Sequence, residues 1–253
     1  MTTADRARLV WITGAGKGIG RELAQHYAQQ GWTVAVSART EADLQLLAEE
    51  LPTGQTKIFP LDVTDHEAVA TTVYQIEHEL GEIDLAILNA GTYTPTPAES
   101  FAVDPFRKLV ETNLMGTVNG LAPLLEIFRK RLSGQIAVVA SLAGYRGLPG
   151  AAAYGATKAG LINMCESLRP DLERSGVRLS IVNPGFVETP LTAKNDFPMP
   201  FLMPAKSAAR RIAEGLETGT FEITFPTRFA LLMQLLRILP DRLFFLLSRR
   251  MVR

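Results

Sequence analysis

The chain of 253 residues is short of several features that mark particular classes of protein. It has one cysteine, Cys165, which excludes an internal disulfide framework and is typical of a reducing compartment. Acidic and basic residues number 26 each, and this balance argues against a nucleic-acid partner. No cluster of metal ligands stands out, and no run of about 18 apolar residues could span a membrane. The first six residues show no apolar signal-type run, so we expect a cytoplasmic protein.

What the sequence does have is a hydrophobic content of 47%, enough for the core of one large domain. Short apolar runs of strand type alternate with segments of helical type. Strands are expected at 8–13, 33–38, 57–61, 84–88, 135–140, 177–182 and 221–225. Long helices are expected over 105–131 and from Tyr154 to near Gly176, with Pro170 kinking or ending the second. This alternation predicts an α/β fold, a doubly wound parallel sheet of seven strands with helices on both faces.

A glycine-rich turn follows the first predicted strand. It reads Gly14-Ala-Gly16-Lys17-Gly18-Ile19-Gly20, and a segment of helical character begins at Arg21. Glycines let the backbone approach a diphosphate, and the helix N-terminus offers free N–H groups and a positive dipole end. The order of strand, turn and helix therefore predicts a Rossmann-type dinucleotide-binding unit.

The choice of dinucleotide depends on the end of the second predicted strand. An acidic residue there would bind the ribose 2′-hydroxyl, but Ala38 and Arg39 stand in its place. Lys17 adds a second cation from the glycine turn. Two cations and no carboxylate favour a 2′-phosphate, and hence NADP(H) over NAD(H). The alternative interpretation is that both cations are ordinary surface charges.

Three residues form a candidate proton-transfer apparatus. Ser141 follows the predicted strand 135–140, and Tyr154 and Lys158 lie four residues apart early on a helix, so these two side chains share a face. An ammonium beside a phenol favours the phenolate, which tyrosine needs near neutral pH because its ordinary pKa is about 10. The Ser141 hydroxyl can hold a substrate oxygen. The pattern predicts chemistry on a carbonyl or an alcohol, and the alternative is a structural Tyr-x-x-x-Lys pair.

Seven sequence elements occur in order at fitting spacing. They are Thr13-Gly14-x-x-x-Gly18-x-Gly20, Asp62-Val63, Asn89-Ala90-Gly91, Asn113, Ser141, Tyr154-x-x-x-Lys158 and Pro184-Gly185-x-x-x-Thr189. Together they resemble the short-chain dehydrogenase/reductase family, in its compact branch, over about residues 8–225. The glycine spacing differs from the Gly-x-x-Gly-x-x-Gly of the longer branch, which holds sugar epimerases.

The resemblance implies a role for each catalytic position. Tyr154 would be the general acid in carbonyl reduction and the base in alcohol oxidation. Lys158 would hold the nicotinamide ribose hydroxyls and lower the pKa of Tyr154, and Ser141 would bind the substrate oxygen. Asn113 would position a water in a proton relay, although a satisfied amide in a helix interior is the alternative.

The resemblance also implies a cofactor site. Asp62 and Val63 would border the adenine, Asn89 and Gly91 the adenosine ribose region, and the segment from Pro184 to Thr189 the nicotinamide. The residues expected to bind the cofactor are Gly14, Lys17, Gly18, Ile19, Gly20, Arg39, Asp62, Val63, Asn89, Ala90, Gly91, Tyr154, Lys158, Pro184, Gly185, Val187 and Thr189.

Family members pair their long helices across a two-fold axis, so a homodimer or homotetramer is expected. Four apolar residues recur at helical spacing on the first long helix, and they could face a partner or the sheet. These residues are Leu121, Leu124, Leu125 and Phe128.

The segment 186–204 resembles the substrate-covering lid of this family. Its second half is rich in apolar residues, which would line a pocket for a lipophilic substrate of the lipid, steroid or long-chain type, or would simply pack on neighbouring helices. The predicted function is hydride transfer between NADP(H) and a hydrophobic carbonyl or alcohol. The alternative is a non-catalytic dinucleotide-binding scaffold or redox sensor with the same fold.

Residues 1–226 are expected to form the catalytic domain, and residues 227–253 a helical tail that continues past the family pattern. Pro240 should break the tail into two short helices. Its residues are mostly apolar, with several arginines and one acid, Asp241. This composition suits peripheral contact with an anionic membrane. The alternatives are packing on a partner subunit or over the substrate pocket.

Overall fold

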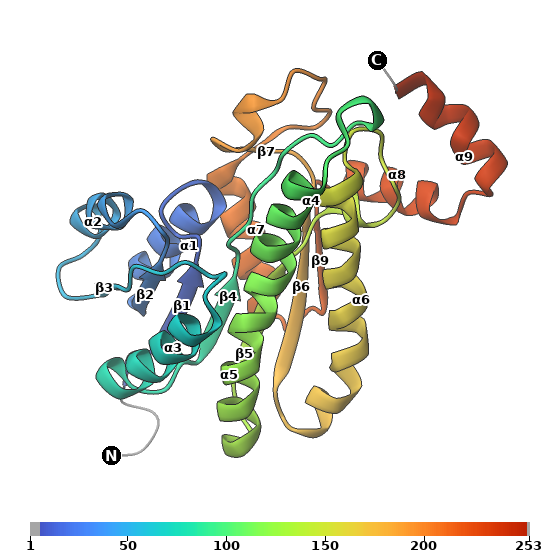
Figure 1. Ribbon diagram of the computed structural model, residues 1–253. Helices are drawn as coiled ribbons and strands as arrows, with labels where there is room; N and C mark the ends of the chain where they lie inside the picture. Colours follow the sequence, from blue (N-terminus) through green and yellow to red (C-terminus); the bar gives the residue numbers. More distant parts are fainter. Residues whose placement is uncertain (1–5, 252–253) are drawn as a thin grey trace.

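Seven parallel strands form the central sheet of the computed structural model, which describes residues 6–251 (Figure 1). The strands are β1 (Leu9–Thr13), β2 (Thr33–Ser37), β3 (Thr56–Ile58), β4 (Leu85–Leu88), β5 (Gln135–Val139), β6 (Arg178–Pro184) and β9 (Glu222–Phe225). Their order across the sheet is β3-β2-β1-β4-β5-β6-β9, and each pairs in parallel with its neighbours. The predicted doubly wound sheet of seven strands is confirmed.

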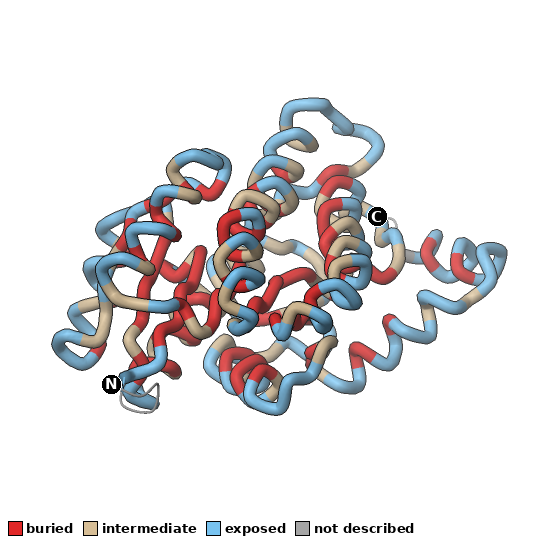
Figure 2. The backbone as a smooth tube through the Cα atoms, turned by 90° about the horizontal axis from the view of Figure 1, so that it is seen from below, coloured by how far each residue is buried: buried red, intermediate tan, exposed pale blue. Residues whose placement is uncertain are grey.

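Helices cover both faces of the sheet. One face carries α3 (His66–Leu80), α5 (Gly116–Arg131) and α6 (Ala152–Arg174), and the other carries α1 (Gly18–Gln29), α2 (Glu41–Glu50) and α7 (Ala205–Glu217). Successive strand residues alternate between the two cores, so Trp11 packs on the α3–α5–α6 side and Ile12 on the other. Figure 2 shows the result, with buried strands between helices whose outer sides are exposed.

The order of the strands reverses at β1. From β1 the chain passes to β2 and β3 on one side, and later returns to place β4 on the other side. Ligands of open α/β sheets bind at the carboxyl ends of the strands at such a reversal. The turn after β1 and the loop after β4 therefore lie where a dinucleotide would be expected.

The predicted helix over 105–131 is one helical run with an irregular centre. It consists of α4 (Val103–Leu109), a π-helical segment (Val110–Met115) and α5. Single-turn π segments are frequent at functional sites, and this one contains Asn113. Of the four apolar residues noted on this helix, Leu121, Leu124 and Phe128 are buried in the core, so their spacing reflects packing on the sheet and not a partner surface.

Helix α6 continues beyond Pro170 to Arg174, so it does not end at the proline. Pro170 lies on the exposed side of the helix. Solvent-side hydrogen bonds of a curved helix are already long, and losing one there disturbs the helix least. Short 3₁₀ turns lie at Ala98–Ser100, Leu142–Gly144, Thr192–Lys194 and Arg249–Met251.

The lid segment and the tail complete the chain. Two short parallel strands, β7 (Val187–Glu188) and β8 (Met203–Pro204), hold the ends of the segment 186–204 together. The tail forms α8 (Thr227–Ile238) and α9 (Asp241–Ser248), so the predicted break at Pro240 is confirmed. In the described part of the chain, no helix has the length and apolar character needed to cross a membrane.

Candidate active site

A hydrogen-bonded clamp joins the turn after β1 to the loop after β4. The Thr13 hydroxyl accepts hydrogen bonds from the backbone N–H groups of Asn89 (3.0 Å) and Ala90 (3.1 Å). The Asn89 amide donates to the carbonyl oxygens of Thr13 (3.0 Å) and Gly14 (3.2 Å). The Asn89 side chain therefore fixes the two loops against each other across the strand reversal.

The glycines of the turn are required by close approach. A Cβ at Gly20 would lie 2.4 Å from the Gly14 carbonyl oxygen, a distance that no real side chain tolerates. Gly18 has a φ of +57°, and a Cβ there would lie 2.9 Å from the Thr189 side chain. Helix α1 thus begins directly against the turn, and no side chain caps its N-terminus. An open helix N-terminus beside a glycine cradle is a site for a diphosphate.

A cleft of about 110 Å³ lies at the carboxyl ends of the central strands. The predicted site residues that line it are Ile19, Asn89, Gly91, Ser141, Tyr154, Lys158, Pro184, Gly185, Val187 and Thr189. The predicted residues outside its lining are Gly14, Lys17, Gly18, Gly20, Arg39, Asp62, Val63, Ala90 and Asn113. The cleft therefore brings the proton-transfer residues together with the segment 184–189.

Lys158 is buried and held in place by the sheet. Its ammonium donates a hydrogen bond to the carbonyl oxygen of Val139 at 2.8 Å, and Nζ lies 5.6 Å from the centre of the Tyr154 ring. Burial disfavours the charged form and lowers the pKa of Lys158 to about 8. The ammonium is thus fixed at the carboxyl end of β5, one helical turn from the phenol.

Tyr154 stands at the wall of the cleft with its ring against Tyr93, edge to face, at 5.2 Å between ring centres. Burial raises the pKa of Tyr154, the Ser141 hydroxyl lowers it, and Tyr93 raises it. Burial dominates, so the lowering of this pKa by Lys158 expected from the sequence is not seen in this arrangement. Ser141 is itself positioned by the backbone N–H of Ala143, which donates to its hydroxyl at 3.1 Å.

Asn113 is fully buried in the π segment, and its amide is paired on all sides. Its Oδ1 accepts from the Thr92 N–H at 2.7 Å, and its Nδ2 donates to the Thr92 carbonyl at 2.9 Å and to the Thr157 hydroxyl at 3.3 Å. The Asn113 side chain is therefore a satisfied amide in a helix interior, which is the alternative interpretation given for it above. It ties the loop after β4 to α6, three residues from Tyr154.

An acidic residue lies beside the cations near the glycine turn. Lys17 pairs with Asp43 at 2.9 Å, and a Cβ at Gly16 would lie 3.7 Å from the same carboxylate. A carboxylate is thus present where the sequence indicated only cations. It comes from the first turn of α2, four residues after Arg39, and not from the end of the strand. Arg39 is exposed.

Two residues were missed by the sequence reasoning, Thr92, which lines the cleft, and Tyr93, which packs against Tyr154. Tyr93 and Thr92 follow the Asn89-Ala90-Gly91 motif directly, and that position was the signal that could have found them. Burial raises the pKa of Tyr93, and Asp196 raises it further. Leu191 and Thr192 line the cleft from the lid, where the Thr192 hydroxyl accepts from the Thr189 N–H at 3.0 Å.

Comparison with a family model and comparison with individual relatives point to the same family. A family model described as short chain dehydrogenase matches residues 8–198. The chain is 38% identical to an uncharacterized oxidoreductase of Myxococcus xanthus over 96% of this chain and 97% of the relative. It is 31% identical to an uncharacterized oxidoreductase of Mycobacterium tuberculosis over 96% and 98%. The chain belongs to the short-chain dehydrogenase family.

The fold agrees with that of a solved short-chain dehydrogenase from Streptomyces avermitilis. The TM-score is 0.82 at 26% identity, covering 91% of this chain and 92% of that one. As a short-chain dehydrogenase the protein is an oxidoreductase that uses a nicotinamide dinucleotide and acts on a small molecule. Among residues 6–251, no group of three or more His, Cys, Asp or Glu residues is placed to hold a metal ion.

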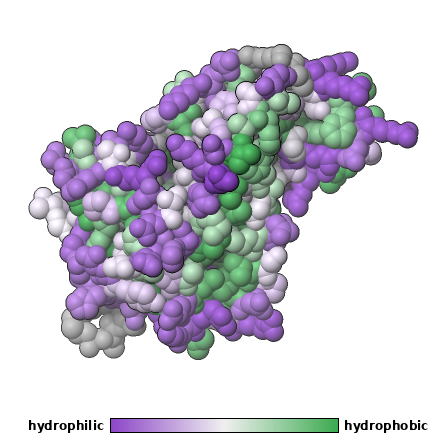
Figure 3. All heavy atoms as spheres, in the orientation of Figure 1, coloured by the Kyte–Doolittle hydropathy of each residue, from purple (hydrophilic) through white to green (hydrophobic). Residues whose placement is uncertain are grey.

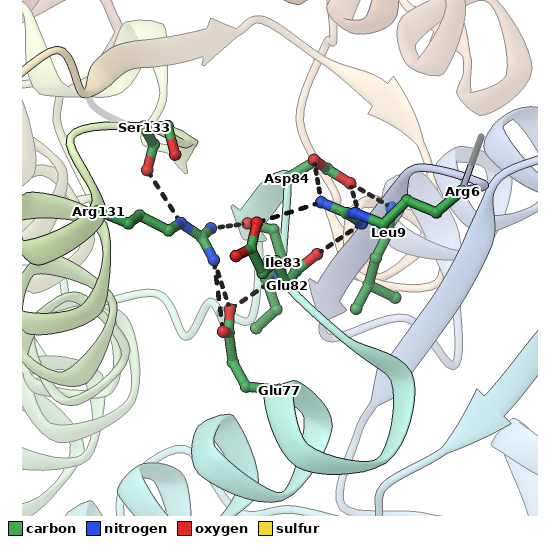
Figure 4. Close-up of polar contacts among 8 residues, drawn as sticks. All are labelled: Arg6, Leu9, Glu77, Glu82, Ile83, Asp84, Arg131 and Ser133. Carbon is green, nitrogen blue, oxygen red and sulfur yellow. Dashed lines mark hydrogen bonds and ion pairs between the residues drawn. The ribbon is translucent and has the colours of Figure 1, made fainter. Parts of the chain in front are cut away.

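A second cavity of this short-chain dehydrogenase, of about 240 Å³, lies at the opposite, amino ends of the strands. Charged residues line it, but Figure 4 shows several of them paired. Arg131 pairs with Glu77 at 3.1 Å, and Arg6 pairs with Asp84 at 2.9 Å while Asp84 also accepts from the Leu9 N–H. This cavity is the larger of the two. The ion pairs and hydrogen bonds of its charged residues have a structural role, because they connect α5, α3 and the starts of β1 and β4. The smaller cleft is the candidate active site because the strand reversal and the proton-transfer residues meet there.

Proposed function

We propose that the protein is an NADP(H)-dependent oxidoreductase that transfers a hydride between the nicotinamide and a hydrophobic carbonyl or alcohol. The observation that carries this proposal is the convergence of Ser141, Tyr154 and Lys158 on one cleft at the strand reversal, beside the glycine turn. A cation, a phenol and a hydroxyl in one cleft are the groups that acid–base chemistry on an oxygen needs.

The glycine turn fits the diphosphate of a dinucleotide. The close approach at Gly18 and Gly20 leaves no room for side chains there, so the turn lies directly against the uncapped N-terminus of α1, whose free N–H groups can bind an anion. Lys17 and Arg39 would face the 2′-phosphate, and Asp62 and Val63 the adenine. When bound, the nicotinamide supplies the hydride chemistry.

The protein's own part is to hold and move a proton. Ser141 would bind the substrate oxygen, and the Tyr154 hydroxyl would donate its proton to that oxygen in reduction. A raised pKa keeps Tyr154 protonated at neutral pH, which suits a proton donor. For alcohol oxidation Tyr154 must first lose its proton, so that direction should accelerate as the pH rises. Asn113 would support this arrangement by fixing the loop that carries Tyr93.

The decisive variant is Tyr154→Phe, measured by NADPH consumption with a panel of hydrophobic ketones and aldehydes. The ring still packs against Tyr93, but the proton donor is gone, so turnover should fall by roughly a hundredfold to ten-thousandfold. NADPH binding, followed by fluorescence, should change little. Tyr74→Phe, on the exposed side of α3, is the matched control and should retain the full rate.

Wild-type protein that binds NADPH but turns over no member of the panel would instead support the non-catalytic scaffold or sensor. Near-normal turnover by the Tyr154→Phe variant would rule out the proposed proton donor.

Cofactor preference is a separate expectation. Arg39→Asp would place a carboxylate beside the 2′-phosphate and should reverse a preference for NADPH over NADH, measured as the ratio of the two dissociation constants. Asp43→Asn removes the carboxylate that pairs with Lys17 and should strengthen the preference by about tenfold. Tighter binding of NADH than NADPH by the unmodified protein would contradict the assignment.

The proposed substrate is lipophilic because the apolar side chain of Leu191 in the lid lines the cleft, beside Ile19 and Val187, which are assigned to the cofactor. Other lid aromatics pack elsewhere, since Phe186 stacks on Phe229 of α8 at 5.5 Å and Phe197 lies against Phe186 at 6.0 Å. Packing on helices thus accounts for part of the lid, as the alternative held.

We also infer that residues 1–226 form the catalytic domain, with residues 227–253 as an appended tail.

A further inference from the structure

The tail carries an outward apolar surface on two consecutive helices. We define this tail face by six exposed residues, Leu231, Leu232, Leu235, Ile238, Leu243 and Leu246. Leu235 is 61% exposed and Ile238 is 78% exposed, far more than packing residues allow. In Figure 1, α8 and α9 extend away from the body of the molecule, and Figure 3 shows apolar and strongly hydrophilic residues side by side on this arm.

The tail face is separate from the side of α8 that packs on the core. Phe229, Ala230 and Met233 are buried against the sheet side of the molecule. At about 100° per residue, Leu231, Leu235 and Ile238 fall on the opposite side of the helix. Packing on the core therefore explains the buried apolar residues of α8. It does not explain the apolar residues on the exposed side of the helix.

The orientation of α9 is fixed by contacts with the body. Asp241 forms an ion pair with Arg146, which also lies over the Phe244 ring at 4.5 Å. Phe244 is buried, while Leu243 and Leu246 are exposed. The arm thus presents its apolar residues outward in a defined way.

The charges of the tail are nearly all positive, in a chain whose net charge is zero. Arg228 lies three and four residues before Leu231 and Leu232, and Arg242 lies four before Leu246, so each arginine shares a face with exposed leucines. The acid in this segment, Asp241, is already paired with Arg146. The tail face is therefore an apolar strip with cations at its edges.

We propose that the tail face docks on the surface of an anionic lipid bilayer, with α8 and α9 lying in the interface. Apolar side chains would enter the headgroup boundary, and the arginines would meet lipid phosphates. A second copy of the chain fits less well. A two-fold interface through this face would bring the same arginines from both copies together without acids to pair them. The proposal is independent of the substrate and cofactor proposed above.

The test is flotation of the full-length protein with two kinds of vesicles, phosphatidylcholine alone and an equimolar mixture with phosphatidylglycerol. Binding is expected to the anionic vesicles at low salt and to decline at high salt. Leu235→Glu with Leu246→Glu should weaken it by tenfold or more, on the order expected for two lost apolar contacts and two added charges. Arg228→Gln with Arg242→Gln should weaken it by roughly 30-fold, since each arginine contributes about fivefold.

Matched controls lie on other helices. Leu46 is an exposed leucine of α2, at 56% exposure, and Arg211 is an exposed arginine of α7. Leu46→Glu and Arg211→Gln should leave vesicle binding unchanged, and circular dichroism with urea unfolding reports that every variant is folded.

Three results would overturn the proposal. The first is failure of the wild-type protein to float with anionic vesicles at low salt. The second is equal binding to neutral vesicles, which would remove the role of the arginines. The third is a fall in oligomeric mass caused by Leu235→Glu, which would make the face a contact between copies.

Discussion

Lys158 is a buried cation whose pKa reports its surroundings. Its ammonium is bonded to the Val139 carbonyl, and burial lowers the pKa from 10.5 to about 8. Between these two values the unfolded chain binds a proton that the folded protein does not. The free energy of unfolding must therefore rise with pH across this window, and that contribution is lost as the pH falls through about 8.

We predict that this rise disappears in the Lys158→Met variant. Between about pH 7 and pH 10, the stability of the wild type relative to the variant should increase by roughly 2 kcal/mol, since one pKa unit corresponds to about 1.4 kcal/mol. Urea denaturation at a series of pH values measures it. Lys206→Met, on the exposed side of α7, should follow the wild type. Parallel curves for the wild type and Lys158→Met would show that the pKa of Lys158 is not lowered.

Much of the candidate site could be predicted from single residues, for a simple reason. Ser141 and Pro184 stand at the ends of adjacent parallel strands, and such ends share one edge of the sheet. Asp43 could not be predicted because its position depends on where α2 packs beside the glycine turn. The raised pKa of Tyr154 also depends on burial, which the spacing to Lys158 does not reveal.

At the scale of elements, the helix α4–α5 acts on the site through its π segment. The segment turns Asn113 into the loop after β4, where it holds both backbone groups of Thr92. The sequence predicted the helix from its length and apolar spacing. The π segment depends on a tertiary contact with a distant loop, so local propensity does not show it. The continuation of α6 past Pro170 could not be predicted from the local sequence either, because the surrounding structure decides whether a proline ends a helix.

We predict that Asn113→Ala lowers the free energy of unfolding by roughly 2–3 kcal/mol, because it leaves two partly buried backbone groups of Thr92 without partners. Asn119→Ala on the same helical run is the control. Asn119 makes one hydrogen bond, to the Val63 carbonyl at 2.9 Å, so about 1 kcal/mol is expected. Urea unfolding of both variants gives the comparison. Equal losses would show that the Asn113 contacts contribute no more than a single bond.

At the scale of the whole molecule, the family implies an oligomer built on α4–α5 and α6. The buried state of Leu121, Leu124 and Phe128 removes one argument for it, and the exposed Met115 is among the residues left on the outer side of this helical run. Association through these helices would leave the tail face open.

We predict a homodimer or homotetramer, with a mass about two or four times the 27.6 kDa of the chain. Static light scattering at several protein concentrations measures it. Met115→Arg should lower the mass because it adds a charge to the proposed contact, whereas Leu235→Glu should not. A monomer at every concentration would contradict the prediction.

The two edges of the sheet have a consequence for aggregation. An edge strand offers unpaired N–H and C=O groups to which a strand of another chain can add. Here β3 has three residues, including Lys57, which pairs with Glu79, and Pro60 follows closely. On the other side, β9 has four residues and passes at once into Pro226 and α8. Short, charged or proline-terminated edges leave little template for sheet extension, so this protein should stay free of fibrillar association even when it is concentrated.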